Sequence, residues 1–215
     1  MIAIFDLDGT IADTIQDLAD AVNYGLREMG YLEHDLTKYK QFVGNGAKKL
    51  CYRALPDNKK SETDRLHELF SRYYGEHFLD NTVLYPHIHE TLTKLSKNDV
   101  ILAVATNKPQ NFARKIIKKL LPDIEFSAVL GGCDERPKKP DNAIIREILT
   151  PLPSSDKIFM IGDSNVDIQT AKNAGLISIG CSWGFRGRQE LTETGADYII
   201  DTADEITEII LGERL

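Results

Sequence analysis

The stretch MIAIFDLDGTIADT, residues 1–14, holds a short apolar run followed at once by an aspartate-rich turn. The run 2–5 has the length of a strand and no polar alternation, which is typical of a strand buried on both faces of a parallel sheet. Asp6 and Asp8 follow two positions apart, so both carboxylates can address one face. Gly9 then lets the backbone turn away. The stretch therefore predicts a buried parallel strand that ends in two neighbouring carboxylates.

Short apolar runs of strand length recur further along the chain, at 100–105, 127–130, 157–161, 176–180 and 197–200. Helical patterns lie between or after them, at 88–97, 109–121, 141–149, 165–174 and 203–211. Strands that alternate with helices indicate right-handed β-α-β units. We therefore expect an α/β fold, with a doubly wound parallel sheet as its Rossmann-like core.

Residues 14–85 interrupt this alternation, because their apolar residues recur at helical spacing and no run is a convincing strand. The spacing is seen at Leu18, Val22 and Leu26 and again at Leu66, Leu69, Phe70 and Tyr73. Asp13 or Thr14 can cap the first helix. We expect a helical cap over 14–85, inserted into an α/β core formed by 1–13 and 86–215. Such an insert lies beside the end of the first strand, where open α/β sheets bind ligands.

The composition is that of a soluble globular protein, with 42% hydrophobic and 27% charged residues among 215. The formal net charge of −7 argues against a general nucleic-acid-binding surface. Three scattered cysteines with no CxxC motif fit a reducing compartment. No apolar stretch approaches twenty residues, and no leader pattern is present. We therefore expect a cytoplasmic protein, a monomer or homodimer, with neither nucleic acid nor membrane as a partner.

Polar side chains follow the other predicted strands as well. They are Thr106 and Asn107 after 100–105, Asp163 after 157–161 with Asp167 one helical turn further, and Lys139, which precedes Pro140. Because the carboxyl ends of parallel strands meet at one edge of a sheet, we expect these side chains to lie near Asp6 and Asp8.

Several carboxylates at one sheet edge repel one another, and a divalent cation would relieve that repulsion. Hard oxygen ligands favour Mg²⁺, which would also attract phosphate. The Thr106 hydroxyl, a nearby lysine and backbone N–H groups would complete an anion site. One carboxylate beside such a site can attack phosphorus and form an aspartyl-phosphate, while a second protonates the leaving oxygen and later activates water. The residues therefore predict phosphoryl chemistry with Mg²⁺ as the cofactor.

Four segments resemble the four motifs of the haloacid dehalogenase superfamily. They are DLDGT at 6–10, Thr106 at a strand end, Lys139 before Pro140, and GDSNVD at 162–167. The motifs stand in the family's order and with compatible spacing, and the resemblance covers essentially the whole chain. The pair DxDGT and GDSxxD is highly specific for this superfamily.

The resemblance implies a role for each motif residue. Asp6 would be the nucleophile and Asp8 the general acid and base. Mg²⁺ would be bound by the Asp6 carboxylate, the Asp8 backbone carbonyl and the Asp163 carboxylate, with Asp167 supporting or ligating. Thr106 and Lys139 would hold the transferring phosphoryl group.

Asp8 separates the chemistries of the superfamily, because its dehalogenases and phosphonate hydrolases lack this second acid. The segments 42–55 and 183–206 are similar to bacterial phosphoglycolate phosphatases. We therefore expect an enzyme, a Mg²⁺-dependent phosphatase acting on a small phosphorylated metabolite, with 2-phosphoglycolate as the first expectation. A phosphomutase, a pyrophosphatase and a non-catalytic phosphate-binding regulatory protein stay open as alternatives.

Three of the motif residues have structural alternatives. Lys138 could take the place of Lys139, although the spacing to proline favours Lys139. Asp167 could merely cap the helix that follows it. Asn107 could bond to the backbone instead of touching phosphate, the contact that we favour.

The cap holds further candidates at Gly44 and Asn45, which form either a simple helix break or a loop that reaches into the site. We favour the loop, and expect both residues to contact substrate. Lys48 or Lys49 could meet a substrate carboxylate, although a solvated helix face is the simpler interpretation. Arg186 is expected to be solvated.

Overall fold

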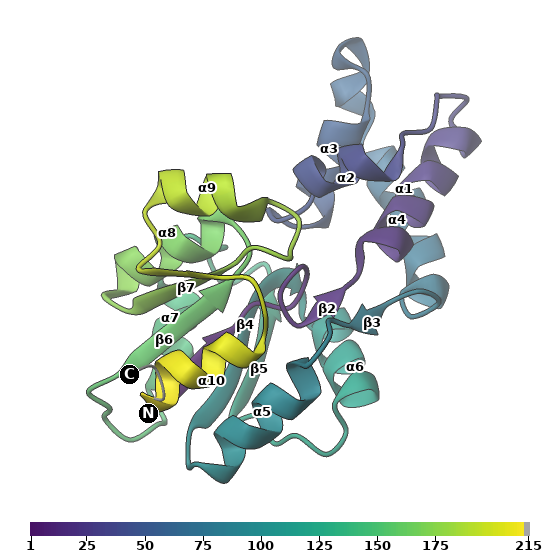
Figure 1. The fold of residues 1–215 in the computed structure, drawn as a ribbon. Helices are drawn as coiled ribbons and strands as arrows, with labels where there is room; N and C mark the ends of the chain where they lie inside the picture. Colours follow the sequence, from purple (N-terminus) through teal and green to yellow (C-terminus); the bar gives the residue numbers. More distant parts are fainter. Residues whose placement is uncertain (213–215) are drawn as a thin grey trace.

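The computed structural model describes residues 1–212, which form a six-stranded sheet with flanking helices and a second group of helices beside it (Figure 1). The strands lie in the order β5-β4-β1-β6-β7-β8, and all of them pair in parallel. Their bounds are β1 Ile2–Phe5, β4 Ile101–Pro109, β5 Ala128–Gly132, β6 Ile158–Gly162, β7 Ile177–Cys181 and β8 Tyr198–Ile200. The expected doubly wound α/β fold is confirmed.

The register of the central strands determines which residues lie together at the C-terminal edge of the sheet. Phe5 at the end of β1 lies level with Val104 of β4 and with Ile161 of β6. Asp6, Thr106 and Asp163 therefore leave the three strands within one residue of the same level. The next strand of this sheet after β1 is β4, and the next after β6 is β7, so the chain proceeds toward opposite edges of the sheet from these two neighbouring strands. Open α/β sheets bind their ligands at such a switch point.

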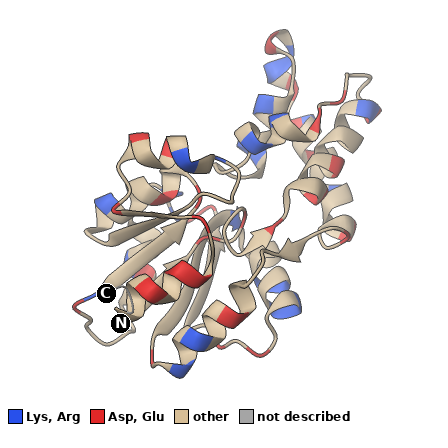
Figure 2. Ribbon diagram, viewed as in Figure 1, with Lys and Arg blue, Asp and Glu red and all other residues tan. Residues whose placement is uncertain are grey.

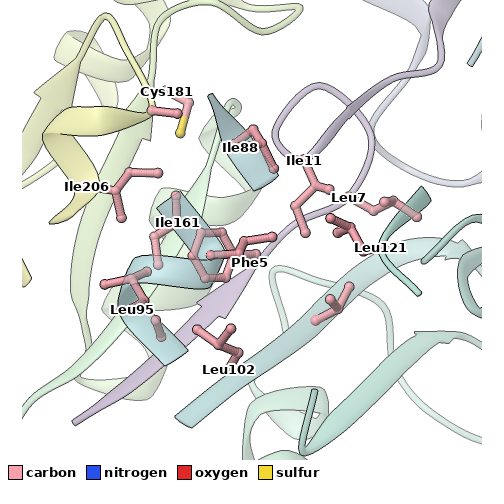
Figure 3. Close-up of a cluster of buried hydrophobic side chains, with 14 of the residues drawn as sticks. Phe5, Leu7, Ile11, Ile88, Leu95, Leu102, Leu121, Ile161, Cys181 and Ile206 are labelled. Atoms are coloured by element: carbon pink, nitrogen blue, oxygen red, sulfur yellow. The ribbon is translucent and has the colours of Figure 1, made fainter. Parts of the chain in front are cut away.

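Helices cover both faces of the sheet. Those on one face are α5 Ile88–Lys97, α6 Gln110–Leu120 and α10 Asp204–Leu211, and those on the other are α7 Ala143–Leu149 and α8 Asn165–Ala174. Ala3 and Phe5 of β1 face the first cluster, and Ile2 and Ile4 face the second. Figure 3 shows Phe5 among the apolar side chains of the first cluster. Burying each large apolar side chain stabilises the fold by about 1.5–3 kcal/mol.

The helix α9, Gly187–Thr194, has no counterpart among the expected helices. Leu191 is its one buried residue. A helix that buries a single side chain carries no apolar period, so pattern reasoning could not detect it.

Four helices form the group beside the sheet: α1 Ile15–Glu28, α2 Leu36–Phe42, α3 Ala47–Ala54 and α4 Thr63–His77, with a 3₁₀ turn η1 at Asp57–Glu62. They bury an apolar cluster of their own. At Gly25 of α1, a Cβ atom would lie 2.6 Å from the Leu66 side chain, so glycine permits the close packing of α1 on α4. This separate cluster supports the proposed division into a core and a cap over 14–85.

A short ribbon joins the core to the cap. Ala12–Asp13 (β2) pairs antiparallel with Val83–Leu84 (β3). No strand was expected near residue 83, because a two-residue strand is too short to show a period. Beside the ribbon, the buried carboxylate of Asp17 accepts four hydrogen bonds of 2.7–2.9 Å from Asn81 and Thr82, two from backbone and two from side chains. Asp17 therefore fastens the start of α1 to the returning chain.

Candidate active site

A buried cluster of carboxylates lies at the C-terminal edge of the sheet. Asp6, Asp163 and Asp167 each offer an oxygen atom, and these atoms lie within 4.8 Å of one another. Asp6 follows β1, Asp163 follows β6, and Asp167 stands in the first turn of α8. The structure thus brings together the three side chains that were expected around a metal ion.

Lys139 is buried among these acids, and its side chain is 1% exposed. Its Nζ lies 2.6 Å from Asp167 Oδ1 and 3.1 Å from Asp6 Oδ1, and it donates to the Ala105 carbonyl oxygen at 2.7 Å. Lys138, in contrast, is exposed. The favoured choice of Lys139 over Lys138 therefore agrees with the geometry.

Charge repulsion remains in the cluster despite this lysine. The pKa of Asp6 is raised to about 6, chiefly by burial; Lys139 opposes the rise, and the Asp167 and Asp8 carboxylates add to it. The pKa of Asp163 is raised well above its ordinary range, chiefly by burial and then by Asp167 and Asp6. Three acids with one lysine leave negative charge that a cation would neutralise.

The donor set fits a hard divalent cation. Asp6 Oδ1 is buried and has no hydrogen-bond partner, because Lys139 Nζ lies 3.1 Å away without hydrogen-bonding geometry. Buried polar atoms are rarely left unpaired unless a ligand or ion completes them. Carboxylate oxygens are the ligands that such cations prefer. Asp6 and Asp163 would hold the cation, with Asp167 beside them.

Two glycines allow the backbone to pack closely against Asp163. Gly9 has φ +87°, and a Cβ there would lie 2.4 Å from Asp163 Oδ2. At Gly184, a Cβ would lie 2.2 Å from the Asp163 Cβ. The Phe185 N–H donates to Asp163 Oδ2 at 2.6 Å. The carboxylate is therefore fixed by its surroundings and cannot easily turn away from Asp6.

Asp8 belongs to a second polar group, which faces the cap. Its Oδ1 accepts hydrogen bonds from Thr14 Oγ1 at 2.7 Å and from Lys108 Nζ at 2.8 Å. Lys108 Nζ also donates to the Tyr74 hydroxyl of α4 at 2.7 Å. Burial lowers the pKa of Lys108, but Asp8 and Tyr74 outweigh that effect and raise it overall, so the ammonium stays charged.

Lys108 was not among the expected site residues. The strand β4 continues to Pro109, four residues beyond the apolar run 100–105. Its register against β5 shifts between Ala105 and Pro109, so a two-residue period does not decide which face Lys108 takes. Lys108 directly follows Thr106 and Asn107, and extending the candidate strand end by one residue would have included it, although its bond to Asp8 could not be predicted.

A pocket lies between this sheet edge and the cap. Asp6, Asp8, Thr106, Asn107, Lys108 and Asp163 line it from the core, whereas the cap contributes mainly apolar side chains, among them Leu18, Val43, Leu50, Phe70 and Tyr74. The Asp6, Asp8 and Asp163 carboxylates therefore open onto a cavity whose cap wall is mainly apolar.

Known proteins are similar to this chain in sequence and in fold. The family model described as haloacid dehalogenase-like hydrolase matches residues 3–181. The chain belongs to this family. It is 35% identical over 206 residues to a phosphoglycolate phosphatase from Pseudomonas syringae pv. tomato, covering 92% of this chain and 75% of that protein.

Two further relatives extend the likeness over nearly the whole length. A phosphoglycolate phosphatase from Vibrio cholerae is 33% identical over 215 residues, which cover 96% of this chain and 95% of that one. The crystal structure of a candidate phosphoglycolate phosphatase from Lactobacillus delbrueckii subsp. bulgaricus has a TM-score of 0.93 and 32% identity, with 98% of both chains covered. The expectation of a hydrolase of the phosphatase type is confirmed.

Asp167 caps a helix in this hydrolase, as one of its two interpretations expected. Its Oδ2 accepts from the backbone N–H of Ser164 at 3.1 Å and from the Ser164 hydroxyl at 2.6 Å, and Ser164 completes a capping box at the start of α8. Its Oδ1 meets Lys139. One oxygen starts the helix while the other faces the acid cluster, so metal ligation by Asp167 stays a prediction.

Asn107 is engaged with backbone groups, the alternative that was not favoured. Its Nδ2 donates at 3.1 Å to the carbonyl oxygens of Gly44 and Lys139, and its Oδ1 accepts from the Lys139 N–H at 2.9 Å. Since the amide group is fully used, a side-chain contact with phosphate would need one of these bonds to break. Asn107 instead links the cap loop to the segment that carries Lys139.

The cap loop reaches the site through its backbone. Gly44 lines the pocket. Asn45 does not, and its Oδ1 accepts from Arg53 Nη2 at 2.8 Å within the cap. The structure thus brings Gly44 to the pocket and leaves Asn45 behind it, because Arg53 holds the Asn45 side chain.

The expected solvation of Arg186 is wrong. Its side chain is 15% exposed, lines the pocket and donates from Nη2 to the Val43 carbonyl oxygen of the cap loop at 2.8 Å. By contrast, Lys48 pairs with Asp64 on an exposed face, and Lys49 lies over the Tyr52 ring. Neither of these lysines lines the pocket.

Figure 2 shows positive and negative residues interspersed over the helices of both parts of the molecule. Within residues 1–212, no helix has both the length and the apolar character needed to cross a membrane.

Proposed function

We propose that this hydrolase uses Mg²⁺ to cleave small phosphomonoesters, 2-phosphoglycolate foremost, through an aspartyl-phosphate on Asp6. The observation that carries the proposal is the buried set of Asp6, Asp163 and Lys139, with Asp8 on the pocket side. The names of the relatives from Pseudomonas syringae and Vibrio cholerae support the choice of substrate.

The chain's own residues divide the work of phosphoryl transfer. The Asp6 carboxylate attacks phosphorus, while Lys139 and the Thr106 hydroxyl compensate charge on the transferring group. Asp6 and Asp163 would hold Mg²⁺, which would supply charge neutralisation for the transferring group. The bond between phosphorus and the ester oxygen breaks as the bond between phosphorus and Asp6 forms. The leaving ester oxygen and the attacking Asp6 oxygen lie on opposite sides of phosphorus.

Asp8 handles the protons of both steps. In the first step it gives a proton to the leaving ester oxygen, so that an alcohol departs. In the second step it takes a proton from water, which attacks the aspartyl-phosphate and releases inorganic phosphate. Thr14 and Lys108 keep the Asp8 carboxylate in place for both transfers.

The location and partners follow the same proposal. We place the enzyme in the cytoplasm, as a monomer or homodimer that acts on a phosphorylated metabolite. The free thiols of Cys51, Cys133 and Cys181 support a reducing compartment.

The test is phosphate release by the full chain from a panel of phosphorylated metabolites, with Mg²⁺ and with excess EDTA. We expect turnover of 2-phosphoglycolate that EDTA abolishes, and acid-stable trapping of labelled phosphate on the protein. Transfer of phosphate to a second position of a sugar phosphate would favour a mutase, and cleavage of pyrophosphate alone would favour a pyrophosphatase. Binding of phosphate without turnover of any ester would refute the hydrolytic proposal.

A further inference from the structure

Lys108 has a buried, charged ammonium group, and not all of its N–H donors are in hydrogen bonds. The residue is 4% exposed and lines the pocket. Its Nζ donates to Asp8 Oδ1 and to the Tyr74 hydroxyl, and the described residues offer no further hydrogen-bond acceptor. An ammonium group has three N–H donors. One donor of Lys108 therefore stays available on the pocket side.

Two other cations near the pocket, Lys139 and Arg186, already have partners of their own. Lys139 already has Asp6, Asp167 and the Ala105 carbonyl oxygen around it. Arg186 bonds to the cap loop, and its Nε lies 3.9 Å from Glu190. Among the described residues that line the pocket, Lys108 and Arg186 are the only cationic ones. Of these two, Lys108 is the one bonded to Asp8, so a second anionic group on the Asp8 side of the pocket would meet Lys108 first.

Lys108 is also held at a fixed position. Its Nζ lies 2.7 Å from the Tyr74 hydroxyl and 5.0 Å from the centre of the Tyr74 ring. Tyr74 is 1% exposed and stacks on Phe70, with Phe112 edge-on against it. A donor that is rigid before the substrate arrives loses little conformational entropy on binding. The site is therefore built for a ligand atom at one position.

We propose that Lys108 binds the substrate carboxylate and makes this enzyme select esters with a carboxylate on the carbon that carries the ester oxygen. This inference rests on the proposed phosphatase function. During transfer the leaving oxygen lies against Asp8, and Lys108 Nζ lies 2.8 Å from an Asp8 oxygen. The carboxylate of 2-phosphoglycolate is joined to the ester oxygen through one methylene carbon. It therefore falls within reach of the open donor of Lys108.

A purely positioning role, in which Lys108 only holds Asp8, predicts a different pattern. Loss of positioning would slow the protonation of every leaving group alike. Loss of a carboxylate contact would affect only substrates that have a carboxylate. The two roles separate when an ester with a carboxylate is compared with one that has a methyl group at the same place.

The experiment measures kcat/KM for 2-phosphoglycolate and for ethyl phosphate, with Mg²⁺, in the wild type and in Lys108→Met. We expect the wild type to prefer 2-phosphoglycolate, and the variant to lose roughly 10- to 100-fold of that preference, as expected for a hydrogen bond between charged groups. An equal loss for both esters would show positioning alone and overturn the carboxylate assignment. Retention of the preference would overturn it as well.

A control and a second variant keep the result interpretable. Lys48→Met removes an exposed lysine that does not line the pocket, and should leave both kcat/KM values unchanged. Should Lys108→Met fail to fold, Lys108→Gln keeps a donor for Asp8 and Tyr74 while removing the charge, and should lose the same preference.

A binding measurement on a variant without turnover distinguishes a failure of this inference from a failure of the proposed function. Calorimetric titration of 2-phosphoglycolate into Asp6→Asn should show binding that weakens roughly 10- to 100-fold in Asp6→Asn/Lys108→Met. If wild-type protein cleaves neither ester, the phosphatase proposal fails, and the titration still decides whether Lys108 recognises the carboxylate. Equal affinities for the two titrated variants would reject that recognition.

Discussion

Asp6 and Asp17 are both buried aspartates, yet the hydrogen bonding of their carboxylates differs. Asp17, beside the ribbon that joins core and cap, accepts four hydrogen bonds from Asn81 and Thr82. Asp6, at the sheet edge, has an oxygen with no hydrogen-bond partner and a pKa raised to about 6. Four hydrogen bonds hold the Asp17 carboxylate in place, whereas Asp6 keeps an unpaired oxygen at a cost in stability. A buried aspartate therefore stabilises the joint between core and cap, whereas the one at the sheet edge has the free oxygen that the proposed attack on phosphorus needs.

The strongest test of this contrast is Asp6→Asn. Removal of the proposed nucleophile should lower kcat by at least about 10⁴-fold. Because the change also removes charge from a repelling cluster, the free energy of unfolding of the metal-free protein should stay equal or rise. Phosphate release and urea unfolding measure the two quantities. Near-normal turnover would reject Asp6 as the nucleophile.

Asp17→Ala should show the reverse behaviour. Four donors at the ribbon lose their acceptor, which should destabilise the fold by about 4 kcal/mol. Turnover below the unfolding transition should change only a few-fold, since Asp17 does not line the pocket. Thr82→Val, which removes one of the four donors, should cost about 1 kcal/mol and serves as the graded comparison. A stable Asp17→Ala protein would show that the ribbon does not depend on these bonds.

The raised pKa of Asp6 predicts a pH dependence of stability for the metal-free protein. Its folded-state pKa of about 6 exceeds the ordinary value of 3.8, so the folded state holds this proton more tightly. The stabilisation is full below pH 4 and is lost as pH rises through 6, about 3 kcal/mol in all. Urea unfolding from pH 4 to 7 should show this loss in the wild type relative to Asp6→Asn. Parallel curves for the two proteins would contradict the assignment.

The smallest effect is expected at Asn45. Its side chain bonds to Arg53 inside the cap and does not line the pocket. Asn45→Ala should therefore change stability by about 0.5 kcal/mol and leave kcat/KM for 2-phosphoglycolate almost unchanged. A tenfold loss of kcat/KM would restore Asn45 as the substrate contact that the sequence suggested.

The sequence was sufficient to predict the α/β core because the patterns that indicate its strands and helices are local. A buried parallel strand such as 2–5 is a continuous apolar run, and the register of the sheet then brings the ends of β1, β4 and β6 together. The choice of Lys139 followed from its neighbour Pro140. The expected bounds of the core helices agree with the structure to within two residues.

The features that were missed depend on partners far away in the chain. The burial of Lys108 is explained by its hydrogen bond to Asp8, one hundred positions earlier. Asp17 is explained by Asn81 and Thr82, and Arg186 by the Val43 carbonyl oxygen. Each of these side chains looks like an ordinary surface charge in its own segment. Only the tertiary structure supplies the acceptor or donor that makes its burial tolerable.

The ribbon of β2 and β3 brings the two joints between the core and the proposed cap side by side. Ala12 and Leu84 are paired neighbours, so the chain leaves the core and returns to it at one place. A chimaera that joins a different cap at these two positions would leave β1 and the Asp6 cluster within the original core. The new cap would have to supply hydroxyls in the places of Thr14 and Tyr74, because Asp8 and Lys108 stay with the core. Such chimaeras would test whether a change of cap alone changes the range of esters that the core cleaves.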